Sequence, residues 1–488
     1  MTEGTTLDAV GDADELPTQP AEPVKPRFDR SITEGPLGRA VWKIAWPTIL
    51  TNIIAGLQGM VDHVLVGNLV GYKANAAIGV SWQIFLLVIV FISSLFMGMS
   101  VLVARFAGAG EKAKVDRTVY QAFLTAVFMG VVVMAPLGYF LSPYLLDLVN
   151  AAPNVKAEAL PYLRVTFAFS IGLMIYFMTS GALRSAGNAR TPMMLGIVMT
   201  VLNLVLNIVL ISGLGPIPAF GTLGSAIGTS IATCLVGTYA VYKMWSGGWV
   251  VGFPRGNGWG PDWKVIRSLF KFGLPSGIQG IAMNVGGLFM LAFIGSVAHG
   301  DAAQAAYAVA YGQLFLLVTW SSNGLMGAAA AVAGQNLGAH KPDRAFAAVN
   351  TAARFGFAGS AILGLFFFFL PEYLLAIFGM TDPAAVAIGV QLLRVLAVSG
   401  IFISVALTYT GGLQGSGDTK SPLYISIISQ VIIPLGICFV VREMTTLQPI
   451  HIWLAILAGH ITRCCLSAAR FLQGKWRTIK VDIETTAA

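Results

Sequence analysis

One acidic side chain lies well inside an apolar stretch of this sequence. Asp62 falls in the stretch 43–68, whereas the other Asp and Glu residues lie in the terminal segments or in and beside polar breaks. It is about 15 residues into the stretch, which on a helix corresponds to roughly 22 Å. An apolar surrounding favours the neutral form of a carboxyl group. Asp62 could therefore take up and release a proton near neutral pH; the alternative is a structural carboxyl group hydrogen-bonded at the helix end.

Two neutral polar residues precede Asp62 on the same face of the expected helix. Gln58 and Thr51 lie four and eleven residues before it, with the small Ala55 between them, and these spacings align side chains along one face. The resulting polar stripe favours a functional role for Asp62. His63 points about 100° away from the stripe and is expected at a helix interface.

A second polar pair occurs in the stretch 191–213. Asn203 and Asn207 are four residues apart and share one helix face. Amides of this kind commonly form hydrogen bonds between transmembrane helices; alternatively, they supply oxygen atoms to whatever Asp62 binds. The spacing leaves both interpretations open. We expect no cofactor, and no metal site apart from a Na⁺ ion that Asp62, Asn203 and Asn207 could hold.

The composition indicates that membrane helices position these residues. Of 488 residues, 56% are hydrophobic and only 11% are charged, against about 25% charged in soluble domains. The net charge of +8 comes from basic residues that mostly stand singly in short breaks. This placement fits a membrane topology better than a nucleic-acid-binding face.

Twelve apolar stretches are each long enough to cross a bilayer as a helix. In the first half they are 43–68, 77–104, 118–142, 160–183, 191–213 and 223–246. In the second half they are 268–297, 303–334, 347–371, 384–412, 422–442 and 449–471. We expect an all-α integral membrane protein with twelve transmembrane helices in two pseudo-symmetric six-helix lobes.

The breaks and tails define the expected units and their orientation. The units are a disordered cytoplasmic tail (1–36), an N-lobe (37–246), a cytoplasmic linker (247–266), a C-lobe (267–471) and a second cytoplasmic tail (472–488). Basic residues such as Arg105, Arg184 and Lys341 gather in the breaks after even-numbered stretches and in both tails. Because positively charged loops remain in the cytoplasm, we expect both termini on the cytoplasmic side of a plasma membrane, the inner membrane of a bacterium.

The two halves repeat one another at offsets of 228 to 230 residues. Met97-Gly98 recurs as Met326-Gly327, and Gly108-Ala109 recurs as Gly338-Ala339. The longest match pairs 181–192 (GALRSAGNARTP) with 411–422 (GGLQGSGDTKSP). Each copy has an even number of spans, so both enter the membrane in the same direction. The lobes should then be related by an axis along the membrane normal, with a shared site between them.

The second copy has no acid equivalent to Asp62, since the corresponding residue is Met290. Chemistry that needs a charge is therefore expected in the N-lobe. The polar and aromatic candidates for lining the substrate cavity are Thr51, Gln279, Asn284, Gln313 and Tyr409. Other aromatic residues, among them Tyr311, could hold a cation but are more often packing residues.

Several catalytic patterns are absent from the sequence. There is no G-x-x-x-x-G-K-[ST] loop for ATP and no H-E-x-x-H motif, and the five histidines form no ligand cluster. No pairing of a nucleophile with a base is evident either. We therefore expect a transporter driven by an ion gradient and not an enzyme.

These features together resemble the multidrug and toxic compound extrusion (MATE) family, within a wider group that includes lipid-linked oligosaccharide flippases. The likeness covers about residues 37–471. The matching segments are Pro47 followed by 59–62 (GMVD), Gly108-Ala109, 181–192, 334–339 (GQNLGA) and 411–419. The resemblance implies antiport of drugs or organic cations against H⁺ or Na⁺, and it maps the family's first-helix coupling carboxylate onto Asp62.

The sequence departs from the family pattern at other acidic positions. One branch has Asn and then Asp four residues later in the fifth helix, where this chain has Asn203 and Asn207. Another branch has acids in the seventh and tenth helices, at places that correspond here to Met283 or Asn284 and to Ile403 or Ser404. These departures favour cation coupling through Asp62 with Gln58, Asn203 and Asn207, and leave H⁺ versus Na⁺ open.

We expect a secondary antiporter that exports amphipathic, cationic small molecules by rocking-type alternating access between the lobes. It should act as a monomer in the lipid bilayer, with a small-molecule substrate and H⁺ or Na⁺ as partners and no nucleic acid. The alternative is a flippase for a lipid-linked substrate. That activity would need a cavity lined with Arg and Lys, and we expect no such residues at mid-depth in the spans. A receptor or scaffold would not explain the duplicated six-helix unit with its intramembrane acid.

Overall fold

The computed structural model describes residues 28–254, 256 and 259–481, and within them every regular element is a helix. The N-lobe comprises α2 (Leu37–Leu69), α3 (Tyr72–Gly108), α4 (Lys112–Val127), the π-helical η1 (Phe128–Met134), α5 (Ala135–Leu148), α6 (Pro153–Ala168), α7 (Ser170–Ser185), α8 (Arg190–Ser212) and α9 (Thr222–Ser246). The C-lobe comprises α10 (Trp263–Gly295), α11 (Gly300–Val309), η2 (Ala310–Leu314), α12 (Phe315–Gly338), α13 (Pro342–Phe369), α14 (Pro371–Ile377), α15 (Pro383–Ser416), α16 (Lys420–Ile427), η3 (Ile428–Ile432), α17 (Ile433–Met444) and α18 (Pro449–Leu472). Two short helices, α1 (Ser31–Glu34) and η4 (Lys475–Thr478), flank the lobes.

The helices confirm the predicted twelve-span, two-lobe fold. Ten helical stretches of the described residues are long and apolar enough to cross a membrane. The pair α6 and α7, bent by 49° at the break between them, forms an eleventh span, and α3, with 37 residues, is long enough to be the twelfth. The C-lobe counterpart of the bent pair is α15, one helix of 34 residues, so the two lobes differ in this span.

The first helix of each repeat links its own lobe to the other. α2 and α10 each contain a proline in the first half, Pro47 and Pro275. The first turns of α2 pack in the C-lobe, where Val41 is buried in a cluster with residues of α12 and α13. The first turns of α10 pack in the N-lobe core, where Leu269 is buried among residues of α3 and α4. Movement of one lobe must therefore involve both of these helices.

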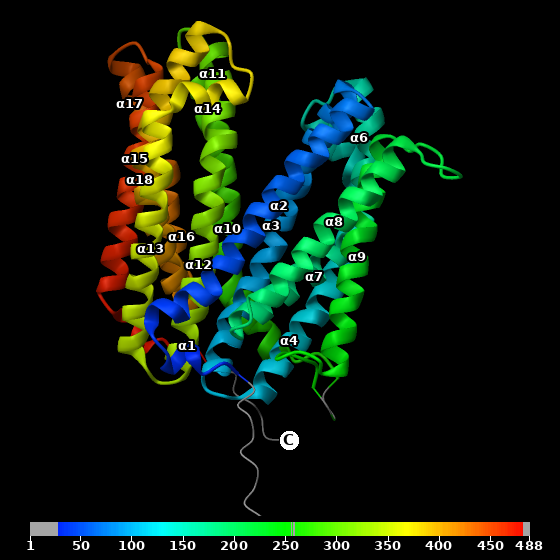
Figure 1. Ribbon diagram of the computed structural model, residues 1–488, viewed down its shortest axis with the longest axis vertical. Coiled ribbons are helices and arrows are strands. Elements are labelled where there is room, and N and C mark those ends of the chain that lie inside the picture. The colour runs from blue at the N-terminus through cyan, green and yellow to red at the C-terminus, as the bar shows by residue number, and fades with distance from the viewer. Residues whose placement is uncertain (1–27, 255, 257–258, 482–488) are drawn as a thin grey trace, which may run out of the picture.

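The lobes meet backbone against backbone at one end of the molecule, here called the closed end. A Cβ atom at Gly108 on α3 would lie 2.0 Å from the carbonyl oxygen of Gln335, and a Cβ atom at Gly338 on α12 would lie 2.0 Å from that of Arg105. Only glycine permits this approach, which explains why Gly-Ala is repeated in the two halves. From the closed end the ribbons of the lobes diverge towards the end that carries α6, α11 and α14 (Figure 1).

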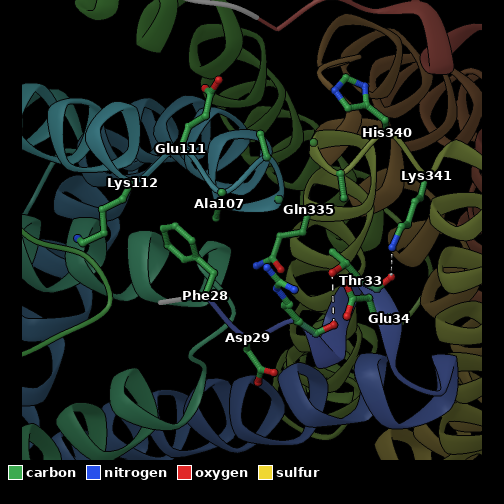
Figure 2. A pocket seen from close by; sticks show the side chains of 16 residues that line it. Phe28, Asp29, Thr33, Glu34, Ala107, Glu111, Lys112, Gln335, His340 and Lys341 are labelled. Atoms are coloured by element: carbon green, nitrogen blue, oxygen red, sulfur yellow. Dashed lines mark hydrogen bonds between the residues drawn. The ribbon is translucent and has the colours of Figure 1, made fainter. Parts of the chain in front are cut away.

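The segment 28–36, here called the N-strap, packs across the closed end. We expected these residues to be part of a disordered tail; instead they include α1, and Ile32 is 0% exposed. The Ile32 carbonyl accepts hydrogen bonds from Asn336 Nδ2 and Arg344 Nη2, both at 3.4 Å. Figure 2 shows the N-strap beside the connections α3–α4 and α12–α13, where it borders a cavity of about 730 Å³. The remaining residues of the expected tail, 1–27, lie outside the described part of the chain.

An ion pair holds the N-strap to the start of α2. Lys43 Nζ donates to the carboxylate of Asp29, which also accepts from the backbone N–H of Ser31 at 3.0 Å. Burial favours the neutral acid, but these hydrogen bonds outweigh it and hold the pKa of Asp29 below its usual value. A lowered pKa means that the contact is present at neutral pH and is lost only when the pH falls through that low value.

The segment 474–481, here called the C-strap, packs across the closed end in an equivalent way. Arg105 Nη2 of the N-lobe donates to the carbonyl oxygens of Ser416 and Ile479, at 3.1 and 3.2 Å. Trp476 is fully buried, and Val481 packs against the N-lobe core. Both straps therefore join the two lobes.

The expected linker between the lobes is held against α4. Lys112 Nζ donates to the carbonyl oxygen of Val250 at 3.0 Å, and Asp116 accepts from the backbone N–H of Gly252 at 2.9 Å. α10 begins at Trp263, which lies inside the range we assigned to the linker.

We expect bulky residues at the two glycines beneath the straps to lower the folded yield. Gly187 and Gly417 end equivalent helices of the two copies with φ of 95° and 97°, a region that other residues rarely adopt. A Cβ atom would also lie 2.6 Å from Ile32 at the first position and 2.9 Å from Val481 at the second. Gly187→Val and Gly417→Val should each reduce the monodisperse peak in size-exclusion chromatography of the solubilised protein, compared with Gly359→Val, where nothing lies within 4 Å. Variants that fold normally but transport nothing would place these loops in the gating machinery instead.

Candidate coupling site

Four side chains from three helices form a hydrogen-bonded polar centre in the N-lobe. Asn207 Nδ2 donates to Asp62 Oδ1 at 2.8 Å and lies 3.4 Å from Asn203 Oδ1. Asn203 Nδ2 in turn donates to Thr229 Oγ1 at 2.8 Å. Asn203 and Asn207 on α8 are 1% and 0% exposed, whereas Asp62 on α2 is half-buried. The hydrogen bonds thus run from the interior of the lobe to a carboxylate nearer its surface.

Close packing of α9 against α8 sets the position of Asn207. A Cβ atom at Gly228 would lie 2.3 Å from Asn207 Oδ1, so only glycine leaves room for the amide. The same Oδ1 is buried and has no hydrogen-bond partner among the described residues. Buried acceptors normally have a partner, and an unpaired one beside a carboxylate is suited to a cation or to the proton of a neutral carboxyl group.

We expect Gly228→Ala to weaken transport without unfolding the protein. The added methyl group must displace the Asn207 amide and so lengthen its 2.8 Å contact with Asp62. The loss of one hydrogen bond to a charged group, worth about 1.5–3 kcal/mol, corresponds to a fall in coupled efflux of about tenfold or more. The measurement is efflux from proteoliposomes, with Gly287→Ala as control because nothing lies within 4 Å of that position. Equal activities of the two variants would contradict this role of Gly228.

The other members of the predicted stripe have separate partners. Gln58 Oε1 accepts from Thr200 Oγ1 of α8 at 2.9 Å, one turn from Asp62. Thr51 Oγ1 donates to the carbonyl oxygen of Pro47 at 2.7 Å, so it serves its own helix. His63 contacts Asn75 of α3, with 2.5 Å between Nδ1 and Oδ1. Gln58 therefore extends the hydrogen bonds between α2 and α8, whereas the Thr51 hydroxyl and the His63 ring do not take part in them.

An apolar cluster lies next to the polar centre. Val66, one turn after Asp62 on α2, is buried with Tyr162 of α6, Ile211 of α8 and Ala226 of α9. This cluster removes water from that side of the carboxylate. Asp62 is thus placed between apolar side chains and neutral amides, without a basic residue hydrogen-bonded to it.

The predicted C-lobe candidates are not brought together with Asp62. Gln279 is buried and donates to Ser426 Oγ at 2.7 Å. Asn284 is exposed and donates to the carbonyl oxygen of Gly280 at 2.9 Å. Gln313 is half-buried in η2. The Tyr409 hydroxyl donates to Asn350 Oδ1 at 2.9 Å. Each of these residues lies within the C-lobe, and the hydrogen bonds found for them are also within that lobe.

Two further residues of the C-lobe bear on the sequence-based expectations. Met290, the counterpart of Asp62, is buried in an apolar cluster with Ile294. The expectation that the spans contain no basic residue at mid-depth is wrong, because Arg463 lies near the middle of α18 and is 2% exposed. It is the only Arg or Lys buried to this degree among the described residues, so it does not form a basic cavity lining.

Thr229, the partner of Asn203, is a site residue that the sequence did not predict. A signal was present: Ser225 and Thr229 are four residues apart in a span rich in small residues, which places both hydroxyls on one face. Such residues are common wherever transmembrane helices pack closely, so the signal does not single out Thr229 without the structure.

The chain is similar to known proteins along most of its length. A family model described as MatE matches residues 47–209 and 275–440. The probable multidrug resistance protein NorM of Thermotoga maritima is 28% identical over 442 residues, covering 89% of this chain and 92% of that protein. The multidrug resistance protein MdtK of Pectobacterium atrosepticum is 25% identical over 451 residues, covering 89% and 95%.

Solved structures share the fold. A MOP superfamily transporter from Pyrococcus furiosus matches with a TM-score of 0.83 and 21% identity, and a MATE family transporter in an outward-facing conformation matches with 0.84 and 20%. Each alignment covers 93% of this chain and 98% of the other. Because the family model covers most of both six-helix halves, the chain belongs to the MatE family and is a transmembrane transporter and not an enzyme.

Proposed function

We propose that this protein exports amphipathic, cationic small molecules from the cytoplasm in exchange for H⁺ or Na⁺. The observation that carries the proposal is the contact of Asp62 with Asn207, which holds a carboxylate inside the membrane region beside neutral amides. Two relatives are named multidrug resistance proteins, which supports drug-like substrates. The Asp62 carboxylate attracts an organic cation and, after it has bound H⁺ or Na⁺, no longer does so.

The polar centre offers different ligands to the two coupling ions. A proton needs only the Asp62 carboxylate. A Na⁺ ion needs several oxygen atoms, and the nearby ones are Asn207 Oδ1, Asn203 Oδ1 and Asp62 itself. Either ion must interact differently with the two conformations of the transporter, because otherwise it would not shift their equilibrium.

The proposed mechanism is alternating access by rocking of the lobes. The loops at the closed end carry Lys112, Arg344 and Lys341, and positively charged loops face the cytoplasm. In this orientation the structure has its cytoplasmic end closed and its lobes diverging towards the outside. Export then requires the glycine contacts of α3 with α12 to separate and reform in each cycle.

The functional test uses purified protein in proteoliposomes loaded with a cationic dye. A pH gradient and a Na⁺ gradient are imposed separately, each without the other. We expect one of them to drive dye against its concentration gradient. If neither gradient drives accumulation of any cationic dye tested, the antiport proposal is wrong.

The orientation is tested by labelling of single cysteines in a background that lacks the four native cysteines. A cysteine at Lys341, at the closed end, should resist a membrane-impermeant thiol reagent in intact cells and react after the membrane is opened. A cysteine at Asp301, at the start of α11 at the opposite end, should react in intact cells. The reverse pattern would place the closed end outside.

A further inference from the structure

One face of α18, in the interior of the C-lobe, carries polar groups that the proposed function does not use. Trp453, His460 and Arg463 are each at most 2% exposed, and their spacing of seven and three residues aligns them on one helix face. His460 stacks on Phe315 of α12, with 5.8 Å between ring centroids. Tyr307 of α11 stacks on Trp453 at 6.0 Å. These rings enclose the middle of the face.

The guanidinium group of Arg463 has no acceptor in this surrounding. Its Nε is buried without a hydrogen-bond partner, and no hydrogen bond or ion pair joins the group to another described residue. Nε1 of Trp453, Nδ1 of His460 and Nε2 of Gln430 are also buried without partners. Gln430 lies against the same helix, since its Nε2 would be 3.5 Å from a Cβ atom at Gly459. The face therefore presents a group of unpaired polar atoms, most of them donors.

No acid of the C-lobe neutralises Arg463. The described Asp and Glu residues of this lobe all lie at or beside helix ends: Asp262, Asp301, Asp343, Glu372, Asp382, Asp418 and Glu443. The most buried of them, Asp418, is already paired with Arg470. A buried guanidinium without a counter-charge is strongly unfavourable, and an anion from outside the chain would supply that counter-charge.

We propose that the interior of the C-lobe binds one singly charged anion, with the guanidinium group of Arg463 as its counter-charge and hydrogen-bond donor. A guanidinium group presents two parallel N–H donors that match a carboxylate. A positively charged group with N–H donors fits a carboxylate, such as one carried by a transported molecule, or a free chloride ion. The single arginine and the enclosing rings do not suit a diphosphate.

The proposal also follows from the duplication. α18 of the second copy corresponds to α9 of the first, which supplies Thr229 to the polar centre of the N-lobe. That centre presents a carboxylate and amide oxygens, whereas the interior of the C-lobe presents the buried guanidinium group of Arg463. The two copies thus have interiors of opposite polarity, the first suited to a cation and the second to an anion. This inference does not depend on the identity of the coupling ion.

The test compares thermal unfolding of the purified full-length protein in detergent at constant ionic strength. Sodium gluconate, whose hydroxylated six-carbon chain is too large for a site enclosed by aromatic rings, is replaced stepwise by sodium chloride or by sodium formate. A ligand that binds only the folded state raises the unfolding temperature in a concentration-dependent way. We expect chloride, formate or both to raise the Tm of the wild type and to leave the Tm of Arg463→Gln unchanged. In gluconate the variant should be at least as stable as the wild type, because it lacks the uncompensated charge. The order of the two Tm values therefore reverses at high anion concentration, which a merely structural arginine would not produce.

A second variant tests the proposal if Arg463→Gln folds poorly. Arg463→Lys keeps the charge and removes the paired donors. It should raise the half-saturating anion concentration about tenfold, as expected for loss of a charge-assisted hydrogen bond. Arg442→Gln, at an exposed position on α17, should respond like the wild type.

The responses to chloride and to formate show which kind of anion the site accepts. A response to chloride alone identifies a free-ion site, and a response to formate identifies a site that accepts carboxylates. The proposal is overturned if neither anion stabilises the wild type relative to gluconate. It is also overturned if Arg463→Gln, or Arg463→Lys where Arg463→Gln does not fold, responds as the wild type does.

Discussion

Asp62→Asn is expected to reduce gradient-driven efflux to the level of protein-free liposomes while the unfolding temperature stays close to that of the wild type. An asparagine side chain has nearly the same shape, and its Oδ1 can still accept the hydrogen bond that Asn207 donates at 2.8 Å. The neutral amide cannot bind a proton and has no charge to attract an organic cation. Coupling is thus lost while the packing of α2 against α8 is kept.

The matched control is Asp301→Asn, an exposed acid at the start of α11, which should transport like the wild type. Asp62→Glu should retain part of the activity, because it keeps the carboxylate but shifts it relative to Asn207. Accumulation of substrate against its gradient by Asp62→Asn would show that the coupling site lies elsewhere. Asn203 and Asn207 would then be the next positions to replace.

Gly108→Val should prevent closure of the end at which the lobes meet and should abolish transport. The new side chain would begin 2.0 Å from the carbonyl oxygen of Gln335, which belongs to α12 and cannot move without that helix. The lobes can satisfy this constraint only by separating. Spin labels at Glu111 and His340, both exposed residues at this end, should report a longer distance than in the wild type. The longer distance should persist when the coupling ion is changed.

Gly338→Val should have the same effect through the reciprocal contact with Arg105. Gly359→Val on α13 is the control, because nothing lies within 4 Å of that position. All three variants should elute as folded monodisperse protein, since the apolar cores of the individual lobes are not altered. A Gly108→Val protein with the wild-type distance and normal efflux would contradict the role assigned to these glycines.

The sequence predicted the parts of this structure that depend on periodicity along one helix. Apolar length identified the twelve spans, and the spacing of four residues placed Asn203 and Asn207 on one face. The structure places that face against Asp62. The repeated Gly-Ala pairs showed the duplication, but not that Gly108 and Gly338 lie opposite one another. Their function as the contact between lobes depends on a relation between helices, which spacing within one helix does not contain.

The residues whose contacts or burial were not predicted are those that depend on packing between helices. The helical phase of Gln279 and Tyr409 shows which face carries them but not that Ser426 and Asn350 are their partners. Arg463 lies near the middle of α18, and its burial follows from the packing of α18 against α15, which the sequence of a single helix does not show. Ile32 lies in a mostly polar segment, and its burial depends on apolar residues of both lobes that pack around it.

The reciprocal glycine contacts between α3 and α12 have a kinetic consequence. Dispersion forces between closely packed atoms fall steeply, and a gap of about 0.5–1 Å already removes a quarter to a half of the attraction. The contact between α3 and α12, in which backbone touches backbone, therefore has no stable half-open position. The transporter should have two stable states. Single-molecule distances measured across the closed end should jump between two discrete values and not change gradually.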